Sequence, residues 1–174
     1  MTGILERLYQ VYLRRKRPIE YARRIGVKMG KDCKIVAPSG GTFGSEPYLV
    51  EFGDHVEISS QVTFVTHDGG AWIFRDEHPD LDVFAPITVG NNVFIGLGST
   101  VLPGTVIGDN CVIGAKSLVR GKLESGGVYA GVPVRFIKPV EDYLEGLLKR
   151  DVGTKSFTAC EKRKFLEKHF SVSP

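Results

Sequence analysis

The chain has 174 residues, of which 23 are Lys or Arg and 20 are Asp or Glu, so its formal net charge at pH 7 is only +3. This near balance gives no reason to expect a nucleic-acid partner. Three cysteines are too few for a disulfide framework, and neither a signal peptide nor an apolar run of about 20 residues is recognisable. We therefore expect a soluble cytoplasmic protein built around one substantial core.

Residues 1–20 are predicted to form an N-terminal amphipathic helix. The stretch TGILERLYQVYLRRKR at 2–17 has apolar side chains at helical spacing, and Pro18 ends it. Five basic side chains against Glu6 give this segment a charge of +4. Two roles fit such a helix: peripheral contact with the inner face of an anionic membrane, or a cap over the open end of the next domain, which we favour.

From residue 21 to 138 the sequence predicts a domain in which an apolar residue recurs every six positions. The pattern starts irregularly at Ile25 and is interrupted at 37–47, where three Gly and two Pro indicate a loop or irregular corner. It then resumes for one full turn at Phe52, Ile58 and Phe64.

A long insertion separates Phe64 from Val89. These residues are 25 positions apart where six would continue the repeat, so 19 residues, about 68–86, are surplus. The surplus must leave the repeat as a loop, and long ordered excursions from rigid scaffolds are commonly functional. It contains the only tryptophan, Trp72, and begins directly after His67.

The most regular repeat runs from Val89 to Leu123. A period of six fits neither a helix nor a long strand, but it fits short strands joined by corners. If three hexads close one turn, a coil takes 18 residues and equivalent apolar residues of successive coils stack. The expected stacked pairs are Val89 on Ile107, Ile95 on Ile113, and Val101 on Val119. A β-sandwich is the alternative, although its strands recur less regularly, every 8–12 residues.

Residues 139–174 are predicted to form a C-terminal helical tail. Segments 139–151 and 156–169 have helical patterns, and the first carries its acids early and its bases late, in accord with the helix dipole. Such helices could cover the unpaired edge of the last coil.

The hexads VGNNVF, IGLGST, VLPGTV, IGDNCV and IGAKSL resemble the repeat of the hexapeptide acyltransferases. The resemblance implies an all-β fold, a left-handed parallel β-helix with short N- and C-terminal helices, which assembles as a homotrimer with active sites at subunit interfaces. The handedness comes from the resemblance alone, because crossovers are usually right-handed. VTFVTHDGG and the repeats after it look like the branch that acetylates sugars or antibiotics.

The same resemblance implies a chemistry. In this branch a histidine at the start of the loop is the general base, a role that falls here on His67, and acetyl-CoA is the co-substrate without any metal. A backbone N–H at or beside Leu97 is implied as the donor to the oxyanion, and no covalent intermediate is expected. Glu51 or Asp54 could orient the imidazole, whereas Asp68 is better explained as a turn residue.

Further residues are expected to bind the two substrates. Trp72, Phe74 and Arg75 could hold the acceptor, or the aromatic pair could pack the loop onto a neighbouring subunit. The basic side chains Arg120, Lys122, Arg135 and Lys138 could bind the phosphates of CoA or could be solvated surface charges. The candidates for contact with acetyl-CoA are Gly96, Gly114, Ala115, Ser117, Arg120, Lys122, Arg135 and Lys138.

The sequence therefore predicts an O-acetyltransferase that modifies a saccharide of the capsule, lipopolysaccharide or exopolysaccharide type. An antibiotic acetyltransferase of the streptogramin or chloramphenicol type and a non-catalytic β-helix scaffold protein are the alternatives. A zinc enzyme resembling the γ-class carbonic anhydrases needs three converging histidines. His55 and His67, 12 positions apart, fall on different sides of the coil and do not fit it.

Overall fold

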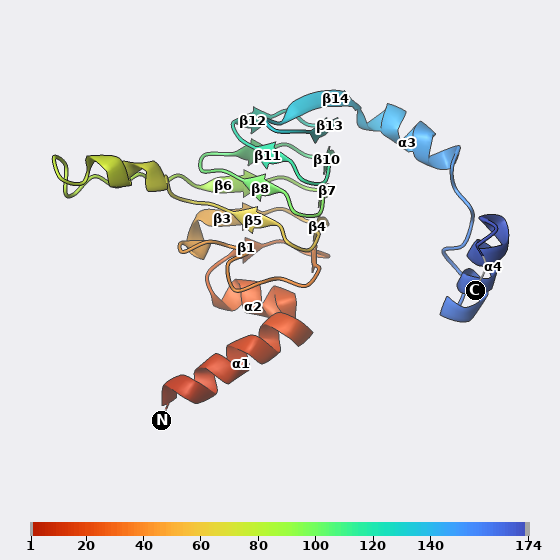
Figure 1. Ribbon diagram of the computed structural model, residues 1–174, viewed down its shortest axis with the longest axis horizontal. Coiled ribbons are helices and arrows are strands. Elements are labelled where there is room, and N and C mark those ends of the chain that lie inside the picture. Colours follow the sequence, from red (N-terminus) through yellow and green to blue (C-terminus); the bar gives the residue numbers. More distant parts are fainter. Residues whose placement is uncertain (1, 173–174) are drawn as a thin grey trace. The chain divides into compact units, whose positions relative to one another are not determined.

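The computed structural model describes residues 2–172, which separate into two compact units at the Tyr143–Leu144 boundary. The first unit contains all the strands and the two N-terminal helices (Figure 1). The second contains most of helix α3 (Val140–Leu148) and helix α4 (Ala159–His169). All residues of the candidate active site belong to the first unit.

The first unit contains three sheets, which the chain enters in turn and in which every pair of neighbouring strands is parallel except β13 and β14. Sheet A consists of β1 (Lys28–Met29), β3 (Val50–Phe52), β6 (Ile87–Val89), β9 (Val106–Ile107) and β12 (Lys122–Leu123). Sheet B consists of β2 (Lys34–Ile35), β4 (Val56–Ile58), β7 (Val93–Ile95), β10 (Cys111–Ile113), β13 (Gly127–Ala130) and β14 (Arg135–Pro139). Sheet C consists of β5 (Thr63–Phe64), β8 (Thr100–Val101) and β11 (Leu118–Val119).

The stacking predicted from the six-residue period is confirmed. Each expected pair is aligned across neighbouring parallel strands, and all six side chains are buried in one core cluster. The aligned pairs are Val89 with Ile107, Ile95 with Ile113, and Val101 with Val119. Each of these strands thus buries at least one aliphatic side chain, and β6 and β7 each bury two, at about 1.5–3 kcal/mol for each fully buried side chain.

The register across the long insertion is also the one that the sequence predicts. Phe52, Ile58 and Phe64 align with Val89, Ile95 and Val101, each pair 37 positions apart. That separation is one coil of 18 residues plus the surplus of 19. The insertion therefore leaves and rejoins the stack without displacing a single rung.

At the N-terminal end, the open coil is closed by a helix that the sequence did not predict. Pro18 ends α1 (Thr2–Lys16) but also occupies the first turn of α2 (Pro18–Arg24). Tyr21 and Ala22 of α2 are buried, and Ala22 belongs to the main core cluster. The favoured capping role thus falls to α2, while α1 packs on α2 and leaves most of its apolar side chains exposed.

At the C-terminal end, β14 turns back and pairs antiparallel with β13. It occupies the edge of sheet B that an incoming strand could otherwise use. The sequence predicted a repeat domain that runs to residue 138, so this reversal within its last residues is a difference from the expected continuation.

In the second unit, α4 begins with a capping box. The Thr158 hydroxyl accepts from the Glu161 N–H, and the Glu161 carboxylate accepts from the Thr158 N–H at 2.8 Å. The ring of Phe157 packs edge-on against Phe165 at 5.7 Å. Helices α3 and α4 lie within the segments for which the sequence predicts them.

Candidate active site

His67 lies at the root of the long excursion, three residues after Phe64, the last residue of β5. The two ends of the excursion are tied together by an antiparallel bridge between His67 and Phe84 and by backbone hydrogen bonds on both sides of it. The N–H of Asp68 donates to the carbonyl of Val83 at 2.9 Å, and the N–H of Ala85 donates to Thr66 at 2.9 Å. The imidazole is thus held on a fixed backbone, and its side chain is 40% exposed.

A carboxylate that the sequence analysis did not consider contacts the imidazole. Oε2 of Glu46 lies 3.1 Å from Nδ1 of His67 and accepts a hydrogen bond of 2.6 Å from the hydroxyl of Thr66. The Thr66 hydroxyl first, and His67 second, hold the pKa of Glu46 below its usual range. Because an ionised carboxylate can only accept, the proton shared with His67 resides on Nδ1.

Glu46 reaches His67 because the irregular segment 37–47 is anchored in the core. Phe43 is buried and stacks on Phe64 of β5 at 5.6 Å. Gly44 follows with φ +64°, and a Cβ there would lie 2.8 Å from the Phe64 carbonyl oxygen. Only glycine permits this close approach, which sets Glu46 beside Thr66 and His67.

The two carboxylates considered from the sequence have other partners. Glu51 forms an ion pair with Lys28 at 3.2 Å, and Asp54 accepts from the backbone N–H of Lys31 at 2.7 Å. The prediction of Glu51 or Asp54 as orienting acid is therefore wrong. Asp68 is a turn residue, as expected, because its carboxylate accepts from the Gly70 N–H at 2.8 Å.

Two adjoining grooves meet at His67. One, of about 320 Å³, is lined by Glu46, His67, Trp72 and Arg75 among others. The second, of about 590 Å³, has Arg120 on its wall together with His67. The structure thus gathers His67 with two of the predicted acceptor residues and one predicted phosphate-binding cation.

The excursion supports only part of the predicted acceptor site. Trp72 is 77% exposed beside His67, whereas Phe74 does not line either groove. Arg75 braces the excursion itself, through the carbonyl of Pro79 at 3.1 Å and the carboxylate of Asp82 at 3.5 Å. Its guanidinium is consequently less free to bind an acceptor than the sequence suggested.

The predicted backbone contacts lie on a different side of the coil. Leu97 and Ala115 occupy equivalent positions in the connections from sheet B to sheet C, whereas His67 lies on the connection from sheet C to sheet A. Within residues 2–172 neither the Leu97 nor the Ala115 N–H has a hydrogen-bond acceptor. The N–H groups of Gly96 and Gly114 are engaged in the ladder, with Ile113 and Tyr129.

The remaining predicted contacts are scattered. Ser117 is buried, and its hydroxyl donates to the Gly114 carbonyl at 2.7 Å. Lys122 forms an ion pair with Glu124 at 2.9 Å on the outer side of sheet A. Arg135 and Lys138 lie exposed on β14. One chain does not bring these groups to His67.

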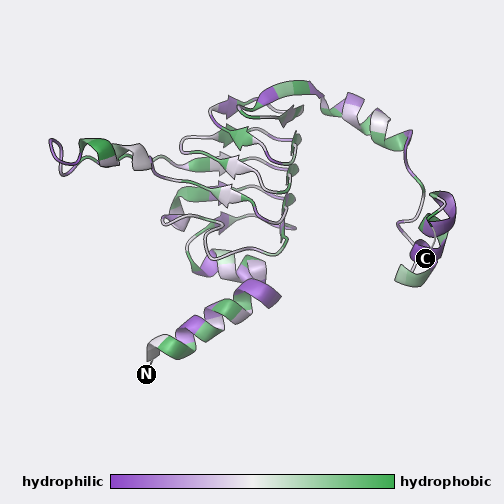
Figure 2. Ribbon diagram, in the orientation of Figure 1, coloured by the Kyte–Doolittle hydropathy of each residue, from purple (hydrophilic) through white to green (hydrophobic). Residues whose placement is uncertain are grey.

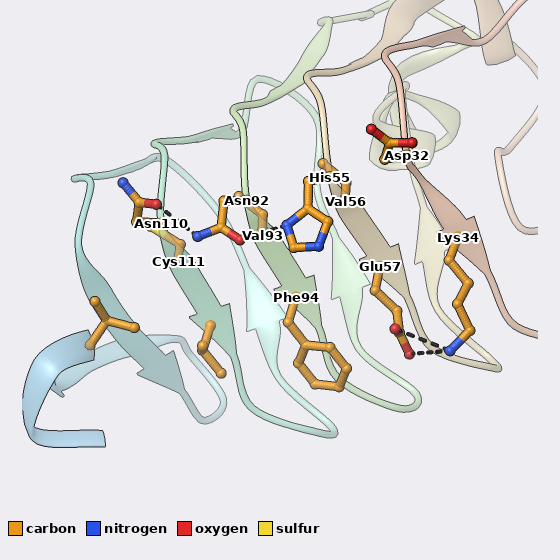
Figure 3. Close-up of a pocket in the computed structure, with 12 residues that line it drawn as sticks. Asp32, Lys34, His55, Val56, Glu57, Asn92, Val93, Phe94, Asn110 and Cys111 are labelled. Atoms are coloured by element: carbon orange, nitrogen blue, oxygen red, sulfur yellow. Dashed lines mark hydrogen bonds and ion pairs between the residues drawn. The ribbon is translucent and has the colours of Figure 1, made fainter. Parts of the chain in front are cut away.

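A further groove of about 370 Å³ runs along the outer face of sheet B, and Figure 3 shows its lining. Its upper edge is a row of corner residues in which His55 Nδ1 contacts Asn92 Oδ1 at 2.8 Å, and Asn92 donates to Asn110 at 2.8 Å. All three have φ between 54° and 56°, a conformation that Asn tolerates well. This row stabilises the corners and contains none of the predicted site residues.

His55 and His67 lie on different sides of the coil and do not converge on one site. His55 lies between β3 and β4, on a different connection from His67. Among the residues that the structure describes, no group of three or more His, Cys, Asp or Glu side chains is placed to hold a metal ion.

The fold of stacked six-residue rungs, with one imidazole at the root of a loop, defines the class of the chain. Residues 86–121 match the family described as bacterial transferase hexapeptide, six repeats. Protein CapG of Staphylococcus aureus is 41% identical over 166 residues, which cover 95% of this chain and 96% of that protein. The chain therefore belongs to the hexapeptide-repeat transferases, and it is an acyltransferase.

Two further similar proteins are both galactoside acetyltransferases. The galactoside O-acetyltransferase of Escherichia coli K12 is 39% identical over 98 residues, covering 56% of this chain and 47% of that enzyme. A solved galactoside acetyltransferase in complex with coenzyme A superposes with a TM-score of 0.54 and 31% identity, covering 69% of this chain and 58% of that one. This chain thus spans only about half the length of those enzymes.

Proposed function

We propose that this protein transfers acetyl from acetyl-CoA to a hydroxyl group of a saccharide, of the capsule, lipopolysaccharide or exopolysaccharide type, in the cytoplasm. The observation that carries the proposal is the contact of 3.1 Å between His67 Nδ1 and Glu46 Oε2. It holds the imidazole in the tautomer in which Nε2 is the basic nitrogen. Within residues 2–172, Nε2 has no hydrogen-bond partner and is available to a substrate.

His67 then acts as the general base in a direct transfer. Its Nε2 accepts the proton of the acceptor hydroxyl while that oxygen bonds to the carbonyl carbon of the thioester. When the carbon–sulfur bond breaks, the imidazolium returns the proton to the sulfur, so the products are the acetyl ester and the thiol of CoA. Glu46 stabilises the imidazolium between these two steps.

The oxyanion of this reaction needs a donor that one chain does not place beside His67. We assign it to the Leu97 N–H of a neighbouring copy, with the Ala115 N–H of that copy on the same slot for CoA. Both N–H groups lack an acceptor in the described part of the chain, and backbone held in a ladder is pre-organised. The arrangement accords with a left-handed β-helix that assembles as a homotrimer, with Arg120 available to a phosphate of CoA.

The saccharide acceptor is supported by Trp72, whose exposed ring borders the groove of His67. Aromatic rings pack on the apolar faces of sugars. The likeness to a galactoside O-acetyltransferase favours the same kind of hydroxyl acceptor.

The test is release of CoA thiol from acetyl-CoA against a panel of free sugars, lipid-linked glycans, a streptogramin and chloramphenicol. Turnover with a saccharide and none with the antibiotics is expected. Turnover with an antibiotic alone would replace the acceptor proposed here. Absence of any turnover, with no binding of CoA by calorimetry, would reject the activity altogether. Light scattering should give three times the chain mass of 19.1 kDa for a trimer.

A further inference from the structure

Helix α1 turns an apolar face away from the protein. Ile4, Leu5 and Leu8 are 70%, 71% and 62% exposed, and Val11 and Tyr12 are exposed as well. At 100° per residue these five side chains fall within an arc of about 120°. Figure 2 shows apolar and polar colours alternating along this helix, which extends from α2.

The opposite side of α1 attaches the helix to α2. Leu13 is fully buried, the carboxylate of Glu6 pairs with Arg24 at 3.2 Å, and the Arg24 guanidinium lies 5.3 Å from the centre of the Tyr9 ring. These contacts fix the rotation of α1 about its axis. The apolar face is therefore held outward by packing that does not use it.

Cations border this face. On the helical wheel Arg7 lies along one edge, Lys16 lies along the other, and Arg15 falls within the face at its last turn. Arg14 is half-buried, and its guanidinium lies close to Gly40 of the segment 37–47. The ion pairs of this region in the described residues join Glu6 to Arg24 and Glu20 to Arg17, so Arg7, Arg15 and Lys16 have no carboxylate partner there. The positive charges of Arg15 and Lys16 in the last turn also interact favourably with the dipole at the C-terminus of the helix. That interaction does not account for Arg7 or for the exposed leucines.

We propose that α1 lies in the surface of an anionic lipid bilayer, with its apolar face in the headgroup region and Arg7, Arg15 and Lys16 on the lipid phosphates. A helix of this pattern partitions to such surfaces without crossing them. In the described residues, no helix is long and apolar enough to cross a membrane. Pairing with α1 of a second copy fits less well, because it would bring the same three cations together.

Membrane binding of the full chain tests the proposal without reference to its activity. Wild-type protein should sediment with vesicles containing 30% phosphatidylglycerol and not with pure phosphatidylcholine vesicles, and about 0.5 M salt should release it. Replacing two apolar side chains, as Leu5→Gln with Leu8→Gln, should abolish binding, since the buried Leu13 still anchors the helix. Neutralising Arg7, Arg15 and Lys16 to Gln should lower the partition coefficient about 100-fold, at about fivefold per cation.

A matched control removes the same charge elsewhere. The triple change of Lys155, Lys162 and Lys164 to Gln, in the second unit, should leave binding unchanged. Equal loss in this control would show a response to net charge alone and overturn the proposal. The proposal would also be overturned if wild-type protein did not bind anionic vesicles, or if the Leu5→Gln, Leu8→Gln variant still bound them. If that variant instead lost oligomeric mass in light scattering, the face would belong between copies of the chain.

Discussion

The coils from Val89 to Leu123 and the two irregular segments, 37–47 and 68–86, follow different rules of construction. In the coils, each strand buries at least one aliphatic side chain at the repeating position, and most backbone groups are hydrogen-bonded in the ladder. In the irregular segments, the chain leaves the ladder twice and returns in register each time. Where these two departures meet, a carboxylate from the first reaches an imidazole at the root of the second. Regular stacking thus supplies a fixed frame, and the interruptions supply the side chains that can react.

The largest expected effect is the loss of turnover on removal of the His67 imidazole, without a loss of stability in the stacked coils. The change His67→Ala should lower kcat about 10³-fold, because it removes the general base, while thermal unfolding stays close to that of wild type. Steady-state release of CoA thiol and circular dichroism measure the two quantities. His55→Ala is the matched control, since that histidine belongs to the corner row, and it should keep its turnover. Wild-type turnover in His67→Ala would remove the proposed base.

Truncation of a side chain that is fully buried in the stacked coils should lower the stability of the protein. Ile95 is fully buried between Ile58 and Ile113, so Ile95→Ala should lower the free energy of unfolding by about 2–5 kcal/mol. The same change at Ile73 in the excursion, where the side chain is 74% exposed, should stay within about 0.5 kcal/mol. Chemical denaturation gives both values. Equal losses at the two sites would contradict the distinction between coil and excursion.

A smaller effect is expected where the two irregular segments touch. Glu46→Gln keeps the shape but loses the charge that stabilises the imidazolium, and kcat should fall about 10- to 100-fold. KM for acetyl-CoA should change little, because Glu46 does not face the proposed CoA slot. Glu51→Gln, which removes a carboxylate paired with Lys28, serves as the control. If Glu51→Gln lost as much activity as Glu46→Gln, the position of the orienting acid would have to be reassigned.

The smallest effect concerns acid stability. Since the pKa of Glu46 is lowered in the folded protein, its stabilising contribution is complete above the unfolded value of about 4.3 and is lost as pH falls through the folded value. The difference in unfolding free energy between wild type and Glu46→Gln should therefore shrink as the pH is lowered below about 5. Urea denaturation at several pH values measures it, and a difference that grows toward acid pH would have the wrong sign.

Much of the coil was predictable because each stacked residue depends on local spacing. Val89, Ile95 and Val101 each repeat after 18 positions, and parallel strands in register place such residues on top of one another. The 19-residue surplus could be counted in the same way. Because the surplus covers about residues 68–86, the count placed His67 directly before the excursion.

The partner of His67 was not predictable by that count. A search at one coil's separation leads to Glu51, but Glu46 stands 21 positions before His67, in a segment that does not follow the repeat. The signal available was Phe43, an aromatic residue in a Gly-rich loop, which indicates a loop anchored in the core. Helix α2 was missed because its seven residues are too few to show a helical period.

The sequence by itself determined the period of the coil, the residues of its core and the site where the chain leaves it, because these depend on which apolar residues recur and at what interval. Only the tertiary structure decided that Glu46 meets His67, that α2 rather than α1 closes the coil, and that β14 reverses. Those outcomes depend on contacts between segments outside the repeat, where Phe43 and Gly44 allow an approach that no interval encodes.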